Sequence, residues 1–404
     1  SNIILVNSQA YELLFISVQT EKQVTASATK DIEWATWTSK IGWPVQGIFK
    51  GVDYTDTNTC HRANNQKVLV TGDDDGYVNL FKYPSVVERS KYKAYIGHSS
   101  HVTRTRFTFN DARVISTGGN DKCVLIWETD FGTGDPGEGD LNLEVDEIAG
   151  GDEAMPSDIV QRKAKKDKYG RGKTTKVQDE DIEEPEANQG GDNFFQVEEV
   201  DGGDEFLAVK PWIGQMKEPT GYKKPPLNQN KPPKVDLTLE YVHGYRAKDC
   251  RNNLRYLKNG GIVYHAAALG IVLDPPSSNN PVPTQRFFNL HTDDITAMDV
   301  HPNGILVATG EIGPKPCIYV WDSNSMQAIF KFKGRLEKGI CNLGFSPSGS
   351  RLVAVAIDND HSIGVYDTEV GVELCADKGD TNKIVDVKFK NENVIRIIIQ
   401  YLTY

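Results

Sequence analysis

The sequence contains no run of about 18 consecutive apolar residues, which is the length that a membrane-spanning helix requires. The most apolar stretch, Val394 to Leu402, is interrupted by Arg396 and Gln400. The opening Ser1-Asn2-Ile3 has neither the basic start nor the small-residue cleavage site of a secretory signal peptide. We therefore expect no membrane partner.

Close cysteine pairs and clustered histidines are also missing. The six cysteines are scattered and form no C-x-x-C pair, whereas structural zinc sites use closely spaced ligands. The eight histidines are dispersed, and no Ser or Cys stands in a motif with a base and an orienting group. We therefore expect reduced thiols, no metal, no cofactor and no catalytic residues.

Charge is distributed unevenly along the chain. The whole chain has a net charge of −11, which argues against a general nucleic-acid binder. Residues 131–206 contain 22 acidic and eight basic side chains, so the remainder carries a net charge of +3. Because this stretch has few large apolar residues, its burial cannot offset the entropy lost on ordering. We expect residues 131–236 to be a disordered or surface-draped charged linker that ends in an extended Lys-Pro stretch, Lys210 to Lys234.

The basic residues of this acidic stretch lie in a single block between positions 162 and 176. A flexible cationic block is suited to contact an acidic partner surface, with a strength that depends on salt. The alternative is a solvated linker whose charge only maintains solubility. The block consists of Arg162, Lys163, Lys165, Lys166, Lys168, Arg171, Lys173 and Lys176.

The regions on either side of the linker are rich in Val, Ile, Leu, Tyr and Thr punctuated by Gly, Asn and Asp, which is typical of strands and turns. Aromatic strand ends recur at a spacing of about 45 residues, as from Phe81 to Trp127. Asp75, Asp121 and Asp360 each precede such an aromatic residue by six positions. This period predicts four-stranded propeller blades.

The best-formed repeat begins at Gly97-His98 and ends at Trp127. A histidine, a hydroxyl, a carboxylate and an indole N–H can satisfy one another inside a blade, where an unpaired polar group costs about 1–3 kcal/mol. We predict that His98, Thr117, Asp121 and Trp127 form this structural tetrad. In a second repeat, from Leu290-His291 to Trp321-Asp322, the position equivalent to the turn aspartate is Lys315, so we expect that turn to differ.

Three passages resemble the echinoderm microtubule-associated protein-like (EMAP-like) family. The first passage is 31–48, which contains Trp34, Trp37 and Trp43, and the second is 60–81. The third passage, 244–264, is similar to the hydrophobic HELP motif of the family. Its matching residues are Tyr245, Arg246, Asp249, Cys250, Arg251, Asn253 and Leu254.

The resemblance implies an all-β fold of WD-repeat β-propeller blades in two partial propellers, joined by the long irregular acidic linker. Family members carry HELP before each tandem of propellers, whereas here it follows the Trp-rich passage, so we expect an internal fragment of a longer protein. Residues 1–130 would be the last blades of one propeller, 131–236 the linker, and 237–404 the HELP-like motif and first blades of the next. In the alternative, both regions close into one propeller of about seven blades.

Several local patterns have a structural and a functional interpretation. The run Asp73 to Gly76 lacks the ligand spacing of a calcium loop, and Gly170 to Thr175 lacks the first glycine of a phosphate-binding loop. In the HELP-like passage, Arg246, Asp249 and Arg251 either recognise a partner or pair internally while Tyr245, Leu254 and Tyr256 pack; we favour the second. We also favour core packing over a ligand cage for the tryptophans of passage 31–48.

The resemblance implies a non-enzymatic scaffold that binds tubulin and microtubules in the cytoplasm and cytoskeleton. It favours a ciliary axoneme, with other axonemal proteins as partners, over a cytoplasmic network. The basic block 162–176 would then contact the acidic tubulin surface. Two alternatives stay open: a general WD-repeat adaptor of a signalling or ubiquitin complex, and an enzyme with a site built on a propeller.

Overall fold

The protein is described by a computed structural model, which covers residues 2–8, 12–49, 57–132, 213–226, 230–250, 252–277 and 281–400. Regular structure in these ranges is almost entirely antiparallel sheet, which confirms the all-β prediction. The exceptions are the short helix α1 (Ala26–Thr29) and 3-10 turns at Trp43–Ile48 and Ile213–Gln215. No helix of the described ranges is long and apolar enough to cross a membrane.

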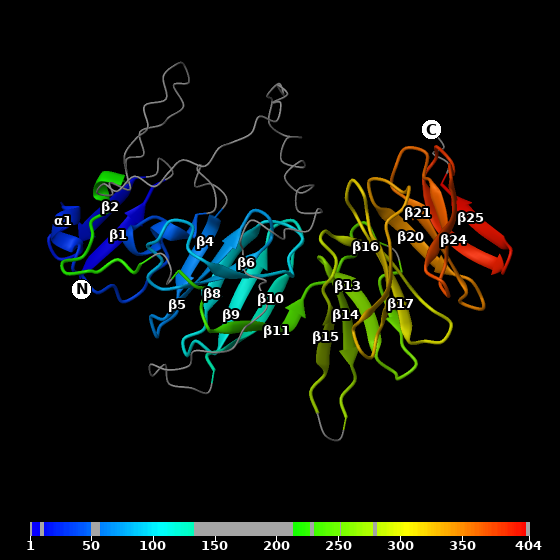
Figure 1. The fold of residues 1–404 in the computed structure, drawn as a ribbon, viewed down its shortest axis with the longest axis horizontal. Helices are drawn as coiled ribbons and strands as arrows, with labels where there is room; N and C mark the ends of the chain where they lie inside the picture. Colours follow the sequence, from blue (N-terminus) through cyan, green and yellow to red (C-terminus); the bar gives the residue numbers. More distant parts are fainter. Residues whose placement is uncertain are drawn as a thin grey trace, which may run out of the picture.

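Three sheets follow one another at the N-terminal end of the chain (Figure 1). Burial in β8 shows why these segments form strands, because Val102, Thr105 and Phe107 are buried and the residues between them are exposed. A bulge between Val102 and Arg104 interrupts strict alternation. The strands are β1 (Ile3–Asn7), β2 (Leu13–Ser17) and β3 (Lys22–Val24); β4 (Thr57–Arg62), β5 (Val68–Asp73), β6 (Val78–Lys82) and β7 (Tyr92–Tyr95); and β8 (Val102–Phe107), β9 (Arg113–Gly118), β10 (Val124–Asp130) and β11 (Asp236–His243).

Four further sheets complete the described fold. Three have four strands each, as the prediction of WD-type blades requires, and the last has two. They are β12 (Arg255–Tyr256), β13 (Ile262–Ala266), β14 (Leu269–Asp274) and β15 (Thr284–Phe288); β16 (Ile295–Val300), β17 (Leu306–Glu311), β18 (Ile318–Asp322) and β19 (Ala328–Phe332); β20 (Ile340–Phe345), β21 (Arg351–Ala356), β22 (Ile363–Asp367) and β23 (Val372–Asp377); and β24 (Ile384–Asn391) and β25 (Val394–Ile399).

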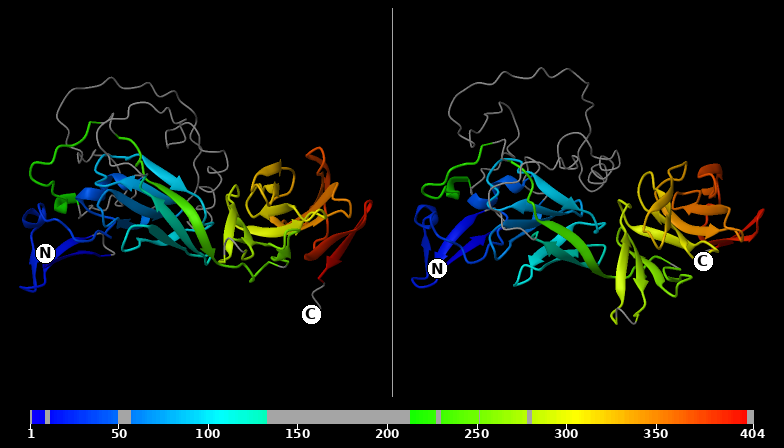
Figure 2. Two further views of the ribbon diagram at one scale, coloured as in Figure 1. Left: turned by 90° about the horizontal axis from the view of Figure 1, so that it is seen from below. Right: turned by 60° about the horizontal axis from the view of Figure 1, so that its bottom comes forward.

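The sheets stand side by side in chain order, and in three neighbouring pairs the first strands contact each other: β4 with β8, β16 with β20, and β20 with β24. The first and the last sheet lie at opposite ends of the molecule in every view (Figures 1 and 2). The described sheets therefore do not close into one ring, and the alternative of a single closed propeller is wrong for them.

One sheet takes strands from both sides of the acidic segment. Strand β11 pairs antiparallel with β10 over its whole length, from Asp130 opposite Asp236 to Val124 opposite His243. The boundaries predicted at 130 and 237 therefore fall inside one blade. The segment between β10 and β11 is an insertion within the β8–β11 blade, and the two groups of sheets meet at this blade.

The hydrophobic core is continuous across this meeting point. A single buried cluster includes Val70 of β5, Leu125 and Trp127 of β10, and Leu269 and Ile271 of β14. Burying such side chains stabilises the fold by about 1.5–3 kcal/mol each, so the blades before and after the insertion stabilise one another.

The described part of the predicted linker lies against the first two sheets. Tyr222 makes an edge-to-face contact with Trp43, with ring centroids 4.5 Å apart. The Thr220 backbone N–H and hydroxyl both donate to the carboxylate of Asp31. Two residues of the stretch 213–226 therefore contact the chain between β3 and β4.

Candidate functional site

A buried relay of hydrogen bonds stands at the start of the β8–β11 blade. His98 Nδ1 lies 2.8 Å from Asp121 Oδ2, and His98 Nε2 lies 2.9 Å from Ser116 Oγ. Trp127 Nε1–H donates to the same Ser116 oxygen at 2.9 Å. All groups are satisfied when Nδ1–H donates to Asp121 and the Ser116 hydroxyl donates to Nε2. We call this set the first relay.

The hydroxyl of the first relay was predicted to be that of Thr117, and this is wrong. Ser116 is fully buried, whereas the Thr117 hydroxyl pairs with that of Thr103 on the exposed side of the sheet. Successive strand residues point to opposite faces, so a shift of one position moves the hydroxyl out of the core. His98, Asp121 and Trp127 lie where the tetrad requires them.

A second relay occupies the β16–β19 blade with different side chains. His291 Nε2 lies 2.7 Å from Thr309 Oγ1, and Trp321 Nε1–H donates to that hydroxyl oxygen at 3.1 Å. His291 Nδ1 lies 3.1 Å from Glu311 Oε2. The carboxylate is therefore supplied by Glu311 at the end of β17, and not by the turn that contains the exposed Lys315.

Glu311 is held as a carboxylate by several donors. Burial favours its neutral form, but hydrogen bonds from His291 and from the backbone N–H groups of Thr292 and Cys317 prevail and lower its pKa to about 2. A carboxylate with this pKa is charged at neutral pH, so the second relay is an electrostatic anchor for the turn after β17.

In two further blades, turn hydrogen bonds are accepted by aspartates that the spacing did not single out. In the β4–β7 blade the buried Asp73 accepts from the Tyr77 backbone N–H at 2.8 Å and from Asn79. In the β20–β23 blade Asp358 accepts from the backbone of residues 360 and 362. Asp360 instead pairs with the exposed Lys378 at 2.9 Å.

The HELP-like passage places one arginine at the meeting point of three blades. Arg246, whose side chain is 9% exposed, pairs with Asp249 at 2.8 Å and with Asp294 at 2.5 Å. Asp294 belongs to the loop before β16 and also accepts from the hydroxyl of Ser99, which follows the relay residue His98. We call Arg246, Asp249, Asp294 and Ser99 the Arg246 junction.

A buried histidine without a relay lies beside this junction. The Asn253 side chain accepts from the His265 backbone N–H at 2.8 Å and donates to the carbonyls of His265 and Arg246. Neither ring nitrogen of His265 has a hydrogen-bond partner among the described residues. Burial, aided by the charge of Arg246, lowers the pKa of His265 to about 3, so the ring is neutral at pH 7.

The other HELP-like residues divide between surface and core. Tyr245, Leu254 and Tyr256 are 53%, 47% and 72% exposed, so the expectation that they pack is wrong. Burial raises the pKa of the Cys250 thiol to about 12, which keeps it protonated. Arg251 lies outside the described residues, as do all eight residues of the basic block 162–176.

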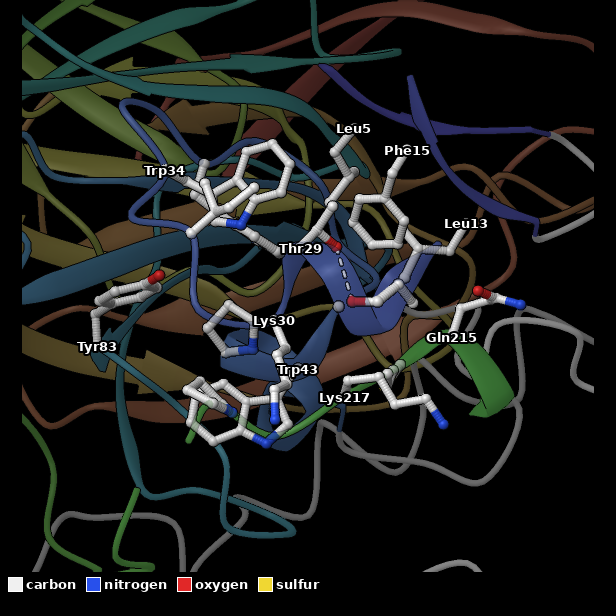
Figure 3. Close-up of a pocket in the computed structure, with 17 residues that line it drawn as sticks. Leu5, Leu13, Phe15, Thr29, Lys30, Trp34, Trp43, Tyr83, Gln215 and Lys217 are labelled. Atoms are coloured by element: carbon white, nitrogen blue, oxygen red, sulfur yellow. Dashed lines mark hydrogen bonds between the residues drawn. The ribbon is translucent and has the colours of Figure 1, made fainter. Parts of the chain in front are cut away.

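The tryptophans of passage 31–48 line a small cavity between the first two sheets (Figure 3). The cavity measures about 110 Å³ and is also bounded by Phe15, Tyr83 and the segment around Met216. Trp37 is almost fully buried and meets Trp34 edge to face. This volume is below the roughly 300 Å³ of a typical ligand pocket. Trp34 and Trp37 also line a second cavity of about 430 Å³, next to Leu5 and Asn7 of β1.

Chemically, the first relay has the composition of a hydrolase triad, with serine, histidine and aspartate in hydrogen-bond order. However, Ser116 and His98 are both 0% exposed, and the Ser116 oxygen is already engaged by the Trp127 indole. A substrate carbonyl has no approach to this hydroxyl. No group of three His, Cys, Asp or Glu side chains in the described ranges is arranged to hold a metal ion.

Comparison with protein families explains this arrangement of blades. Residues 1–129 match the family model of the second β-propeller of echinoderm microtubule-associated proteins. Residues 232–271 match the HELP motif, and residues 282–322 match the WD domain, G-beta repeat. The predicted resemblance to the EMAP-like proteins, with WD-type blades and a HELP motif, is confirmed.

Individual relatives include microtubule-associated and ciliary proteins. The ciliary WD repeat-containing protein ctxp80 of Euplotoides octocarinatus is 34% identical over 211 residues, which cover 48% of this chain and 28% of that protein. The 77 kDa echinoderm microtubule-associated protein of Lytechinus variegatus is 46% identical over 30% of this chain and 18% of its own length. Echinoderm microtubule-associated protein-like 1 of Mus musculus is 44% identical over 31% of this chain and 16% of its own length. The matched residues thus span less than a third of each of these relatives.

Proposed function

We propose that this chain is part of a non-enzymatic microtubule-associated scaffold that binds the tubulin lattice, within the cytoskeleton and specifically the axoneme of cilia. The names of the relatives support this proposal, because they include microtubule-associated proteins and a ciliary WD-repeat protein. Under this proposal tubulin is the main partner, and other axonemal proteins are further partners.

The structural observation that supports the proposal is that the buried polar residues of the relays hold the blades in place. The histidine, carboxylate and hydroxyl groups of the two relays form hydrogen bonds within their own blades, and the Arg246 junction links three blades. A continuous core adds to this rigidity. Rigid blades present several surfaces at fixed distances, and simultaneous contacts with a repeating lattice raise the effective concentration of each further contact to about the millimolar range.

The basic block 162–176 remains our candidate for direct contact with tubulin. In the chain it lies between β10 and β11, which pair with each other in one blade. A cationic segment tethered there would gain Coulomb attraction to the acidic lattice, and this gain decreases as salt increases.

The test is cosedimentation of the purified chain with microtubules in the absence of other proteins. We expect the unchanged chain to pellet, and the variant R162Q/K163Q/K165Q/K166Q/K168Q to bind more weakly, with the larger difference at low salt. The matched control K22Q/K258Q/K315Q/K383Q/K390Q removes the same number of charges from exposed blade positions. Equal binding of both variants would assign the contact to the blade surfaces. A chain that does not pellet would contradict the proposed function and favour the WD-repeat adaptor.

A further inference from the structure

The first sheet has three strands, whereas the complete blades of this chain have four. In a complete blade such as β4–β7, the first strand pairs with one edge of the second. Because β3 is followed in the chain by β4, the first strand of the next blade, β1 takes the position of a second strand. Among the described residues, no strand pairs with β1 on the side away from β2.

The backbone of β1 has hydrogen-bonding groups on this side. The Ser8 backbone N–H donates to the Glu12 carbonyl at 3.2 Å, so the even-numbered residues are those that bond to β2. Because backbone groups alternate in direction along an antiparallel strand, the N–H and C=O groups of Leu5 and Asn7 point away from β2. The described residues provide no hydrogen-bond partner for these backbone groups.

A cavity of about 430 Å³ lies beside this edge of β1. Its other lining residues belong to the segment 34–39, which is fixed to the second blade because the Arg62 backbone N–H donates to the Trp37 carbonyl at 3.0 Å. The Ser39 hydroxyl donates to the side-chain carbonyl of Asn7 and so joins the segment to β1. The volume is above the roughly 300 Å³ at which ligand sites begin.

The lining of this cavity favours an uncharged ligand. None of its nine lining residues has an ionisable side chain, and its polar side chains are those of Asn7, Thr36, Thr38 and Ser39. A charged ligand would lose hydration there without gaining an opposite charge. An extended peptide, in contrast, adds to a free sheet edge through neutral backbone hydrogen bonds.

The two walls of the cavity also favour a single strand over the edge of another sheet. Strand β25 of a second copy would be such an edge, because it is already paired with β24, and it contains the charged Arg396. A second copy of this chain therefore fits the cavity poorly through this strand.

The first strands of the other sheets indicate which side chains suit this position. Five of these six strands begin with a buried β-branched residue, and a bulge follows it. In β20 this residue is Ile340, which packs so closely on Gly310 of the preceding blade that a Cβ added to the glycine would lie 2.7 Å from that of Ile340. The five residues are Thr57, Val102, Ile295, Ile340 and Ile384.

We propose that the cavity beside β1 binds an extended, uncharged peptide segment of a partner protein, which begins with Val, Ile or Thr. The segment pairs with the backbone of Leu5 and Asn7 as an added strand. It matches β1 in length, which is five residues. This interaction is separate from binding to the tubulin lattice and gives the scaffold a second kind of partner.

The first experiment compares hydrogen exchange of the full chain with and without a probe peptide. The probe is the β16 sequence with Asp299→Asn, blocked at both ends so that it carries no charge. We expect exchange of the Leu5 and Asn7 amides to slow by about tenfold, while the amides of Ile4 and Val6, which already bond to β2, change by less than about twofold. Unchanged exchange at Leu5 and Asn7 would overturn the proposal.

The second experiment measures the affinity of the labelled probe for two variants by fluorescence anisotropy. T36R/T38R places two charges in the cavity, and we expect it to bind the probe about tenfold more weakly. The matched control T20R/T238R adds the same charges outside the cavity and should stay within about twofold of the unchanged chain. All four threonines are exposed, so equal thermal midpoints should accompany both variants.

A probe with alternate backbone amides methylated cannot pair with β1 and should bind about tenfold more weakly. Equal binding of the methylated probe, equal losses in both variants, or no binding of the probe by the unchanged chain would each overturn the proposal. Self-association that T36R/T38R abolishes would also overturn it, because a second copy would then be the occupant. Cosedimentation with microtubules tests the proposed function separately from all of these results.

Discussion

The β8–β11 and β16–β19 blades both bury a histidine and a tryptophan, and they satisfy these groups with different partners. The first blade uses Ser116 and Asp121, and the second uses Thr309 and Glu311. Asp121 lies in the turn after β9, whereas Glu311 ends strand β17. One more methylene group lets the carboxylate reach the same imidazole nitrogen from an earlier backbone position. The fold thus specifies the hydrogen bonds and leaves open which residue makes them.

Removing the indole should break both relays, with the larger effect in the second. Trp321 is fully buried and stacked on Phe288 with ring centroids 4.8 Å apart, whereas Trp127 makes a tilted contact with Tyr95 at 6.0 Å. We expect Trp321→Ala to cost about 4 kcal/mol in free energy of unfolding, and Trp127→Ala about 3 kcal/mol. Denaturant titration measures both, and a larger loss at Trp127 would contradict the ranking.

Lowering the pH should reduce the free energy of unfolding through His265, the buried histidine that belongs to neither relay. The pKa of His265 is lowered to about 3 in the folded chain, while the unfolded chain takes up this proton near its ordinary value of 6.5. Unfolding is therefore favoured as pH falls from 6.5 towards 3, and at pH 4.5 this single group costs about 2–3 kcal/mol.

We expect His265→Leu to flatten the dependence of the free energy of unfolding on pH between 6.5 and 4.5. His61, whose pKa burial lowers to about 4, and Glu311, at about 2, keep a slope of the same sign. Urea titrations at several pH values provide the measurement. A slope identical to that of the unchanged chain would show that His265 accepts a proton in the folded state.

Exchanging Asp and Glu in the two relays tests whether the length of each acidic side chain is matched to its backbone position. We expect Glu311→Asp and Asp121→Glu each to cost about 2 kcal/mol, because the shorter side chain falls short of the imidazole and the longer one does not fit its turn. The control is Glu337→Asp, an exposed position outside both relays where the change should be close to neutral. Thermal or denaturant unfolding of the three variants decides, and two neutral exchanges in the relays would show that neither carboxylate is fixed by its length.

The smallest expected effect tests the identity of the hydroxyl. Ser116→Ala leaves the His98 nitrogen and the Trp127 N–H without their partner, and we expect a loss of about 1.5 kcal/mol. Thr117→Ala removes only a surface contact and should cost less than about 0.5 kcal/mol. The reverse order in denaturant titrations would restore Thr117 to the tetrad.

The sequence was sufficient for the repeating parts of the fold, because strand ends, turns and the flanking His98 and Trp127 recur at a fixed period. It could not decide between Ser116 and Thr117, because that choice depends on which residues of β9 face the core. Glu311 was missed because a Gly-Pro insertion displaces the turn to which the spacing pointed.

Contacts between distant segments could not be predicted from local sequence patterns. Nothing in the sequence of β10 indicates that its next partner is β11, on the far side of the acidic segment. The same holds for Arg246, whose partner Asp294 belongs to the loop before another blade. The exposure of Tyr245 and Tyr256 was missed because aromatic residues near strands usually pack.

The central claim is that the relay groups hold the blades and take no direct part in function. Its most direct test is to measure the thermal midpoint and the microtubule affinity of the folded Ser116→Ala variant side by side. The account predicts that the midpoint falls by about 3 °C while the Kd for microtubules stays within about twofold of that of the unchanged chain. A Kd that rises about tenfold with an unchanged midpoint would contradict the claim.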